Sequence, residues 1–271
     1  MTAPLLDIRN LSLSVGDKQL LRDIDFSVNA GECLALLGPN GAGKSTLLHA
    51  LSGGASTVRD RIWLRGRSLA QWSGAELARF RAVMSQHTTV AFPIRVDEVV
   101  ALGLPGRRGG NVRDPLVASL LEWLEVAHLR SRAYPSLSGG EQQRVQLARV
   151  LAQLWDASGP RLLLLDESTS ALDPAQQYLT VEKLASLAAT GDWSVVLVCH
   201  DLSLASSFAS RVLMLQQGRL VADGSPDTVL TAQRLAQVYG LDCCRLPLEG
   251  RSSLHIKGAL RRAPAPPGSM P

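Results

Sequence analysis

Apolar and polar positions alternate along residues 6–28, "LDIRNLSLSVGDKQLLRDIDFSV", around a central Gly-Asp pair. A period of two that is interrupted by a turn dipeptide predicts an antiparallel β-hairpin. Three later stretches differ, because they are short and almost wholly apolar: "GECLALLG" at 31–38, "RLLLLD" at 161–166 and "SVVLVC" at 194–199. Strands of this kind are typical of a parallel sheet that is buried on both faces.

Segments with helical or weaker strand patterns fill the spaces between these strands. The alternation of strands and helices predicts an α/β fold with a mostly parallel sheet and an N-terminal antiparallel β subdomain. Residues 86–158 contain no strong strand pattern, so we expect them to form an inserted helical subdomain. The predicted helices are 44–53, 75–83, 115–128, a helix from Ser138 to about Trp155, 174–189 and 202–210, and the further strands are 61–66, 211–215 and 219–223.

Composition places the chain among ordinary globular proteins, with 46% hydrophobic and 19% charged residues in a length of 271. The longest apolar runs are far shorter than the roughly 20 residues that cross a bilayer. The N-terminus "MTAPLLDIRN" has no signal-peptide pattern. The four cysteines have no metal-ligand spacing, as expected of reduced thiols. We therefore expect a cytoplasmic protein.

The net charge of +4 comes from the C-terminal end. Four basic residues and no acidic residue follow Glu249, which leaves 24 basic (28 − 4) and 24 acidic residues in 1–249. A neutral body lacks the basic excess that is typical of nucleic-acid-binding domains, so we expect no nucleic-acid partner. The final segment "RRAPAPPGSMP", residues 261–271, has low complexity, which predicts disorder.

Residues 38–45, "GPNGAGKS", have the spacing G-x-x-x-x-G-K-[ST] between a buried strand and a helix, which predicts a P-loop NTPase core. Glycines let backbone N–H groups converge on a triphosphate, and the helix N-terminus adds its positive dipole end. Lys44 would reach the β- and γ-phosphates, and Ser45 would bind Mg²⁺. We therefore expect ATP and Mg²⁺ as ligands. The predicted nucleotide-binding residues of this loop are Gly38, Pro39, Asn40, Gly41, Ala42, Gly43, Lys44, Ser45 and Thr46.

Polar residues stand at the ends of two other buried strands. Asp166 and Glu167 end "RLLLLDE", and His200 follows "SVVLVC". Because ligands of parallel sheets bind at the carboxyl ends of strands, Asp166 is expected to hold Mg²⁺. Glu167 would orient or deprotonate the attacking water. His200 would donate to a γ-phosphate oxygen.

"LSGGEQQR", residues 137–144, predicts a second anion site at a helix start. Ser138 and Glu141 have capping-box spacing, and the amides of Gly139 and Gly140 would form a donor array for a phosphate. One triphosphate needs one phosphate loop. The second array is therefore expected to meet something other than the nucleotide that the chain's own P-loop binds.

Together these motifs resemble the ATP-binding-cassette (ABC) ATPases, and "LSGGEQQR" is close to the signature sequence of that family. The resemblance covers residues 5 to about 245. It implies an ABC ATPase domain at 1–245, with the helical subdomain at about 86–158, and a partly disordered C-terminal extension at 246–271. It also implies a two-fold homodimer in which the Ser138 face of one subunit covers the ATP on the partner's P-loop.

The resemblance assigns further roles. Gln86 matches the Q-loop glutamine, which touches Mg²⁺ and senses the γ-phosphate. Residues 170–173, "SALD", match the loop that crosses the dimer interface, and His200 matches the switch histidine. The implied catalytic residues are Glu167, His200 and Gln86, and the implied metal ligands are Ser45, Gln86 and Asp166.

Two positions depart from the family pattern. Val15 stands where the family usually has an aromatic that stacks on adenine, so nucleotide affinity or base selectivity is expected to be reduced. Ser168 stands where proline commonly follows the catalytic glutamate, which is expected to loosen the loop without loss of activity.

The stretch from Gln86 to Gly103, "QHTTVAFPIRVDEVVALG", resembles importers of haem, iron-siderophore complexes and cobalamin, with haem importers most similar. The resemblance implies an ATPase subunit that powers haem import through a separate permease, with siderophore or cobalamin import as alternatives. Either Phe92, Val96, Val99 and Val100 contact the permease, or they belong to the core of the helical subdomain.

The same resemblance implies the setting of the protein. We expect transmembrane permease subunits and a periplasmic substrate-binding protein as partners, with the ATPase peripheral on the cytoplasmic face of the inner membrane. A competing hypothesis is a soluble ABC ATPase that remodels ribosomes, DNA or protein complexes. The basic segment from Arg251 to Arg262 is either a membrane-surface or permease contact, or a solvated disordered tail.

Overall fold

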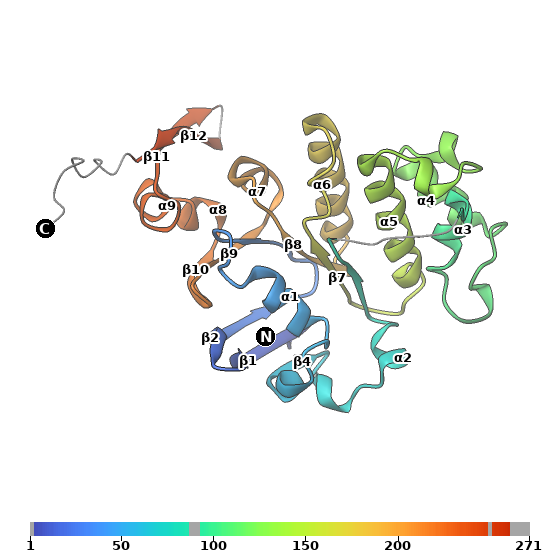
Figure 1. Cartoon of the computed structure of the whole chain (residues 1–271), viewed down its shortest axis with the longest axis horizontal. Helices are drawn as coiled ribbons and strands as arrows, with labels where there is room; N and C mark the ends of the chain where they lie inside the picture. The colour runs from blue at the N-terminus through green and yellow to red at the C-terminus, as the bar shows by residue number, and fades with distance from the viewer. Residues whose placement is uncertain (1–2, 87–92, 249–250, 261–271) are drawn as a thin grey trace, which may run out of the picture.

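A six-stranded sheet runs through the middle of the molecule (Figure 1). The computed structural model describes residues 3–86, 93–248 and 251–260. The strand order is β10-β9-β3-β8-β7-β6, and every neighbouring pair is parallel except β9 and β10. The strands are β3 (Cys33–Leu37), β6 (Arg81–Met84), β7 (Arg161–Asp166), β8 (Trp193–Val198), β9 (Arg211–Gln216) and β10 (Arg219–Gly224).

Both faces of this sheet are covered, as the wholly apolar strands predict. In β7, Leu163 and Leu165 belong to one buried cluster, and Leu162 and Leu164 belong to the other. All four side chains are fully buried. Figure 1 shows α6 and α7 on one side of the sheet and α1 on the other. The covering helices are α1 (Lys44–Leu51), α6 (Pro174–Ala189) and α7 (Leu202–Phe208).

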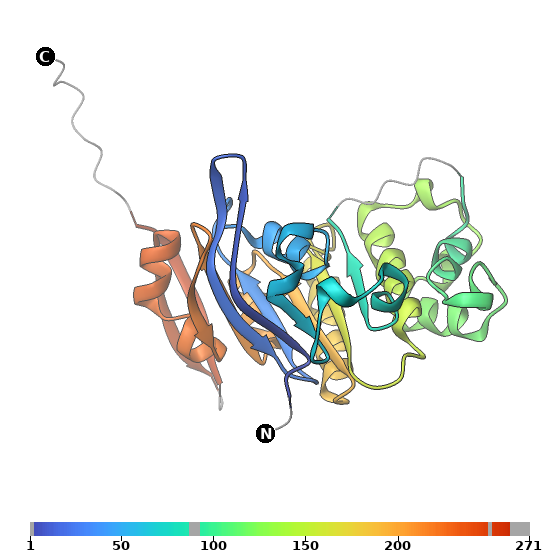
Figure 2. The same cartoon turned by 90° about the horizontal axis from the view of Figure 1, so that it is seen from below.

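A second, four-stranded sheet in the order β2-β1-β4-β5 forms the N-terminal antiparallel subdomain. The predicted hairpin consists of β1 (Leu6–Val15) and β2 (Lys18–Val28), and Figure 2 shows it standing out from the core. Leu6 and Ile8 are buried at alternate positions, and Leu11 and Leu13 are buried after a register shift in the pairing of β1 with β2. The other strands are β4 (Ile62–Leu64) and β5 (Arg67–Ser68).

The inserted subdomain is helical and lies at the opposite end of the molecule from the C-terminal strands (Figure 1 and Figure 2). Its helices are α3 (Val96–Ala101), α4 (Pro115–Trp123) and α5 (Gly139–Leu154). Asp114 caps α4 by accepting a hydrogen bond from the Leu116 N–H, and Pro115 fills the first helical position. None of the helices in the described ranges is long and apolar enough to cross a membrane.

One predicted helix is wrong. Residues 75–83 contain only the short helix α2 (Gly74–Leu77), after which the chain enters β6. Ala82 in β6 pairs with Leu163 in β7 at the edge of the parallel sheet. The pairing with β7 outweighs the local helical spacing, since a short apolar stretch is compatible with either structure.

The C-terminal region contains more regular structure than the sequence predicts. After α8 (Pro226–Val229) and α9 (Ala232–Tyr239), the strands β11 (Leu241–Leu248) and β12 (Arg251–Ala259) pair as an antiparallel hairpin. The idea of a solvated disordered tail is therefore wrong for 251–259. The expected boundary at residue 245 falls inside β11, and the low-complexity end at 261–271 lies outside the described residues.

Short 3-10 turns complete the elements, at Ser56–Arg61, Leu69–Gln71, Gly106–Arg108, Ala127–Leu129 and Tyr134–Ser136.

We predict that Leu164→Ala lowers the free energy of unfolding by about 2–5 kcal/mol, because Leu164 is fully buried in the strand that carries Asp166 and Glu167. Chemical denaturation measures the change. As a control, Leu179→Ala removes a side chain that is 40% exposed and should change stability by less than about 1 kcal/mol. Equal losses in the two variants would contradict the burial of β7.

Candidate nucleotide-binding site

The loop between β3 and α1 has the backbone that a phosphate cradle requires. Gly38 has φ +150°, and a Cβ there would lie 2.3 Å from the Leu215 carbonyl oxygen. Gly43 has φ +105° and forms the N-cap of α1. Side chains are strained or excluded at these two positions, so the glycines are required by the fold of the loop. The loop and the start of α1 line one pocket, and a helix N-terminus is where anions bind favourably.

Lys44 is held within this loop. Its side chain is 6% exposed, and its Nζ donates to the carbonyl oxygens of Gly38 at 2.8 Å and Pro39 at 3.2 Å. Burial lowers the pKa of Lys44, while Glu167 and Asp166 oppose that shift. The ammonium group is thus fixed at the pocket by neutral carbonyls, which leaves its positive charge available to phosphate oxygens.

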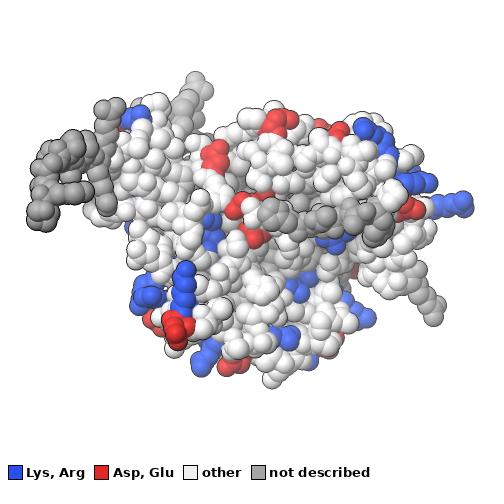
Figure 3. Space-filling model, viewed as in Figure 1, with Lys and Arg blue, Asp and Glu red and all other residues white. Residues whose placement is uncertain are grey.

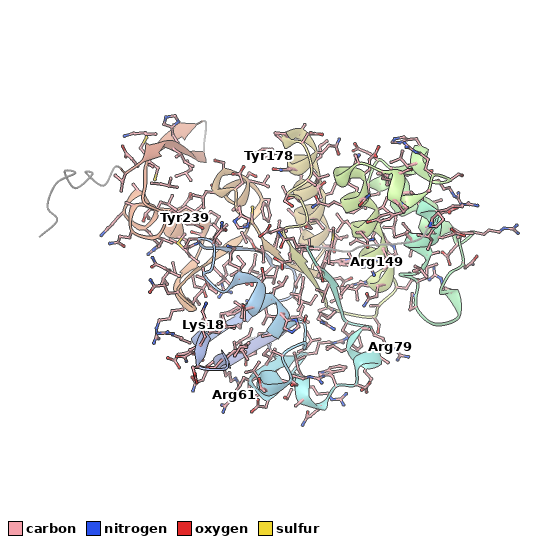
Figure 4. All side chains as sticks on the ribbon, viewed as in Figure 1. Lys18, Arg61, Arg79, Arg149, Tyr178 and Tyr239 are labelled. Atoms are coloured by element: carbon pink, nitrogen blue, oxygen red, sulfur yellow. The ribbon has the colours of Figure 1, made fainter. Side chains whose placement is uncertain are left out.

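A pocket of about 530 Å³ opens beside the loop. Glu167 and His200 line it together with the P-loop, so the structure brings these sequence-predicted residues to one place. Lys18, labelled at the hairpin in Figure 4, also lines the pocket and was not singled out by the sequence motifs. The residues that line the pocket are Lys18, Gln19, Leu20, Arg22, Asn40, Gly41, Ala42, Gly43, Lys44, Ser45, Thr46, Glu167, His200, Gln217 and Gly218.

The carboxyl end of β7 contributes a carboxylate whose oxygens could bind a metal ion. The Ser45 hydroxyl donates to Asp166 Oδ1 at 3.4 Å. Burial raises the pKa of Asp166, and the hydrogen bond from Ser45 opposes the shift. A partly buried carboxylate beside a hydroxyl suits a hard divalent cation, which would compensate the cost of the buried charge. The residues present therefore fit Mg²⁺.

Glu167 is held by two of the other predicted residues. Gln86 Nε2 donates to Glu167 Oε2 at 2.6 Å, and His200 Nε2 lies 2.5 Å from Glu167 Oε1. The Glu167 backbone has φ +49°, a left-handed conformation that is uncommon for residues other than glycine. Strained backbone of this kind persists where the surrounding structure enforces it, and it is concentrated at functional sites. The three groups thus form one connected unit, in which Glu167 and His200 line the pocket and Gln86 bonds to Glu167 from outside its lining.

The signature segment has the predicted cap but lies apart from the P-loop pocket. Ser138 Oγ accepts from the Glu141 N–H at 3.3 Å, and Glu141 Oε2 accepts from the Ser138 N–H at 2.7 Å. The Ser138 N–H lowers the pKa of Glu141. Gly139 lines a separate pocket of about 360 Å³ with Gln86. Within one chain, Ser138, Gly139 and Gly140 are not among the residues that line the pocket beside Lys44.

The glycines of the signature also have a packing role that the sequence did not indicate. A Cβ on Gly140 would lie 3.0 Å from the Ala171 carbonyl oxygen and 3.2 Å from Leu172 Cδ2. A Cβ on Gly139 would lie 3.3 Å from the Ala171 Cβ. The start of α5 therefore packs closely against the loop that follows Glu167.

Gln143 is a contact that sequence reasoning missed. Its side chain bonds to the loop after β7, at the Glu167 carbonyl oxygen, Ser170 Oγ and the Ala171 N–H. The available signal was its spacing, since it follows Gly140 by three residues and so lies on the same helix face.

The two residues that depart from the family pattern, Val15 and Ser168, differ in exposure. Val15 ends β1 at the hairpin tip and is 66% exposed. Ser168 is 4% exposed, and its hydroxyl has no hydrogen-bond partner among the residues that the structure describes. The expected effects on nucleotide affinity and on the loop stay predictions.

Charges of both signs are interspersed on the face of the molecule that Figure 3 shows. Acidic side chains gather near its middle, and many basic side chains lie toward its edges. A continuous basic stripe would be typical of a nucleic-acid interface.

A family model described as "ABC transporter" matches residues 21–170. The chain belongs to the ABC transporter family. The matched range begins in β2 and ends in the loop after Glu167, so it includes the P-loop, Gln86 and the signature of this ABC ATPase domain.

Two similar curated proteins carry the same name. The "Hemin import ATP-binding protein HmuV" of Pseudomonas fluorescens is 46% identical over 88% of this chain and 93% of its own length. The protein of that name from Shewanella denitrificans is 46% identical over 88% of this chain and 94% of its own length.

Solved structures have the same fold. A metal-chelate type ABC transporter in an inward-facing conformation aligns with a TM-score of 0.76 and 25% identity, over 94% of this ABC ATPase and 98% of that chain. The ADP conformation of MJ1267, an ATP-binding cassette of an ABC transporter, aligns with a TM-score of 0.71 and 23% identity. The alignment covers 88% of this chain and 99% of the MJ1267 chain.

We predict that Asp166→Asn raises the Tm of the protein by a few degrees when it is measured at neutral pH without nucleotide or metal. Burial raises the pKa of Asp166, so its ionised form costs stability in the folded state. That cost develops as the pH rises from the unfolded-state pKa of about 3.9 through the higher folded-state pKa. The gain in Tm should therefore grow over that window and then stay constant.

Thermal melts as a function of pH measure this effect. Asp60→Asn is the control, because the Asp60 side chain is 64% exposed. A gain from Asp166→Asn that is already complete below the unfolded-state pKa would contradict the electrostatic explanation.

Proposed function

We propose that this chain is the ATP-hydrolysing subunit that powers import of haem through a separate membrane permease. The observation that carries the proposal is 42–46% identity over 88–92% of the chain to proteins named hemin import ATP-binding protein. Import of an iron-siderophore complex or cobalamin is the alternative, and similarity to a metal-chelate type ABC transporter structure is compatible with haem and with either of these substrates.

ATP would bind at the pocket beside α1. The P-loop amides and Lys44 would hold the phosphates, and Ser45, Asp166 and Gln86 would hold Mg²⁺. Bound Mg²⁺ supplies charge neutralisation on the β- and γ-phosphate oxygens. Val15 would offer apolar contact to the base without stacking.

Hydrolysis would depend on the unit formed by Gln86, Glu167 and His200. Glu167 would orient the attacking water and accept its proton. His200 Nε2 lies close enough to Glu167 to orient it, and a ring N–H of His200 would donate to the γ-phosphate when ATP is bound. Gln86 joins the carboxylate to the start of the helical subdomain and would link that subdomain's position to the chemistry.

The Ser138 face would act in a homodimer. Ser138, Gly139 and Gly140 lie apart from the chain's own P-loop pocket, and they expose a helix N-terminus that suits phosphate. A two-fold dimer would place this face on the partner's ATP, so that two nucleotides lie between two P-loops and two signatures.

The permease would contact the helical subdomain on the cytoplasmic face of the inner membrane, and a periplasmic binding protein would deliver the substrate. Val96, Val99 and Val100 are buried, so contact of these side chains with the permease is excluded and they are core. Phe92 lies outside the described residues. Leu102, at the end of α3, is 62% exposed and is the apolar side chain of this subdomain that we propose for that contact.

Reconstituted uptake tests the transported substrate. The chain and the permease that co-purifies with it are placed in proteoliposomes with internal ATP, and uptake of haem, a ferric siderophore and cobalamin is compared. ATP-dependent haem uptake supports the proposal, whereas uptake of another chelate alone assigns that substrate. Co-purification of ribosomal or DNA-repair partners without a permease would contradict the transport function.

We predict that Glu167→Gln retains ATP binding and accumulates a closed dimer, while steady-state hydrolysis falls by at least about hundredfold because the general base is lost. Size-exclusion chromatography with Mg-ATP and a phosphate-release assay measure both effects. Lys44→Ala is the control that should bind no nucleotide and stay monomeric. Rapid hydrolysis by purified Glu167→Gln would exclude Glu167 as the general base.

A further inference from the structure

Gln143 connects α5 to the loop that carries Glu167. Its Nε2 lies 3.4 Å from the Glu167 carbonyl oxygen and 3.2 Å from Ser170 Oγ, and it donates to both. Its Oε1 accepts from the Ala171 N–H at 3.1 Å. Both ends of one amide are therefore occupied by a single loop that lies 24–28 residues further along the chain.

The start of α5 is built so that this side chain can reach the loop. Gly139 and Gly140 bring the helix against Ala171, since a Cβ at Gly140 would lie 3.0 Å from the Ala171 carbonyl oxygen. Gln143 follows Gly140 by three residues, so the two positions share one helix face. The close approach at Gly140 places the amide of Gln143 opposite the polar backbone of the loop.

The backbone that Gln143 contacts sets the direction of the Glu167 side chain. Glu167 has φ +49°, and its carbonyl oxygen accepts from the Ser170 N–H at 3.1 Å as well as from Gln143. A left-handed residue other than glycine is held in place by its surroundings. Since φ and ψ fix the Cα–Cβ direction, the groups that hold this carbonyl also help to aim the carboxylate at the pocket.

We propose that Gln143 is a positioning residue for hydrolysis, which holds the backbone of Glu167 so that its carboxylate faces the pocket. The inference rests on the proposed ATPase function and deepens it. Gln143 lies on the helix that begins at Ser138, the residue proposed to meet the partner's nucleotide. One rigid element thus joins the part of α5 that would sense the partner to the residue that would act on the chain's own ATP.

The test compares Gln143→Leu with Gln153→Leu on the same helix. Gln153 Nε2 donates to the carbonyl oxygens of Ala78 at 2.7 Å and Arg81 at 3.1 Å, so it also ties α5 to the core but has no bond to the Glu167 loop. Each leucine keeps the approximate volume and removes the amide. Steady-state ATP hydrolysis gives kcat and KM, and thermal melts give the loss of stability in each variant.

We expect Gln143→Leu to lower kcat about tenfold, equivalent to about 1.4 kcal/mol, with the KM for ATP changed by less than about twofold. Gln143→Asn, whose amide is one methylene shorter, should lose a similar factor. Gln153→Leu should keep kcat within about twofold, even if it lowers the Tm as much as Gln143→Leu does. In the Glu167→Gln background, Gln143→Leu should add no further loss, because the carboxylate that it positions is already absent.

Three results would overturn the inference: an unchanged kcat in Gln143→Leu, an equal loss of kcat in Gln153→Leu, or a full additional loss in the Glu167→Gln background. Absence of ATP hydrolysis in the unmodified chain would instead contradict the proposed function, so the two failures are distinguishable.

Discussion

Parallel pairing of β3, β8 and β7 is the constraint on which the site depends. In this register Leu36 pairs with Val198, and Val198 pairs with Asp166, so the three strands end at one level. Residues that follow each strand are therefore delivered to one edge of the sheet: the P-loop after β3, Glu167 after β7 and His200 after β8. Because the apolar side chains of these strands are buried on both faces, the edge is fixed by the core rather than by the polar groups that it displays.

The polar groups at that edge are arranged for function at some cost to stability. Asp166 and Glu167 are adjacent carboxyl groups, burial raises the pKa of Asp166, and Glu167 adds to the shift. Lys44 offsets part of this charge but is itself bonded to the carbonyls of Gly38 and Pro39. A divalent cation would offset the cost of the buried Asp166 carboxylate, and phosphates would pair with the Lys44 ammonium group.

The helical subdomain is joined to this edge at two points. Gln86, two residues after the end of β6, bonds the Glu167 carboxylate, and Gln143 bonds the Glu167 carbonyl from α5. Both contacts are made by neutral amides, which donate without adding charge to the site. The geometry of Glu167 therefore depends on where α5 lies relative to the loop after β7.

Much of this protein could be predicted from the sequence, because its signals are local. The apolar strands, the glycines of the P-loop, the Ser138–Glu141 capping box and the acidic residues at the end of β7 can each be recognised from a few consecutive residues. What tertiary structure decided involves partners far along the chain. Residues 81–84 became β6 because Leu162–Leu165 offered an edge to pair with, and Val96, Val99 and Val100 became core because the other helices cover them. Strands β11 and β12 stabilise each other by antiparallel pairing, and the role of Gln143 exists only where α5 meets the loop after Glu167. A sequence pattern encodes which positions are buried, but the contacts that bury them are set by the packing of the whole chain.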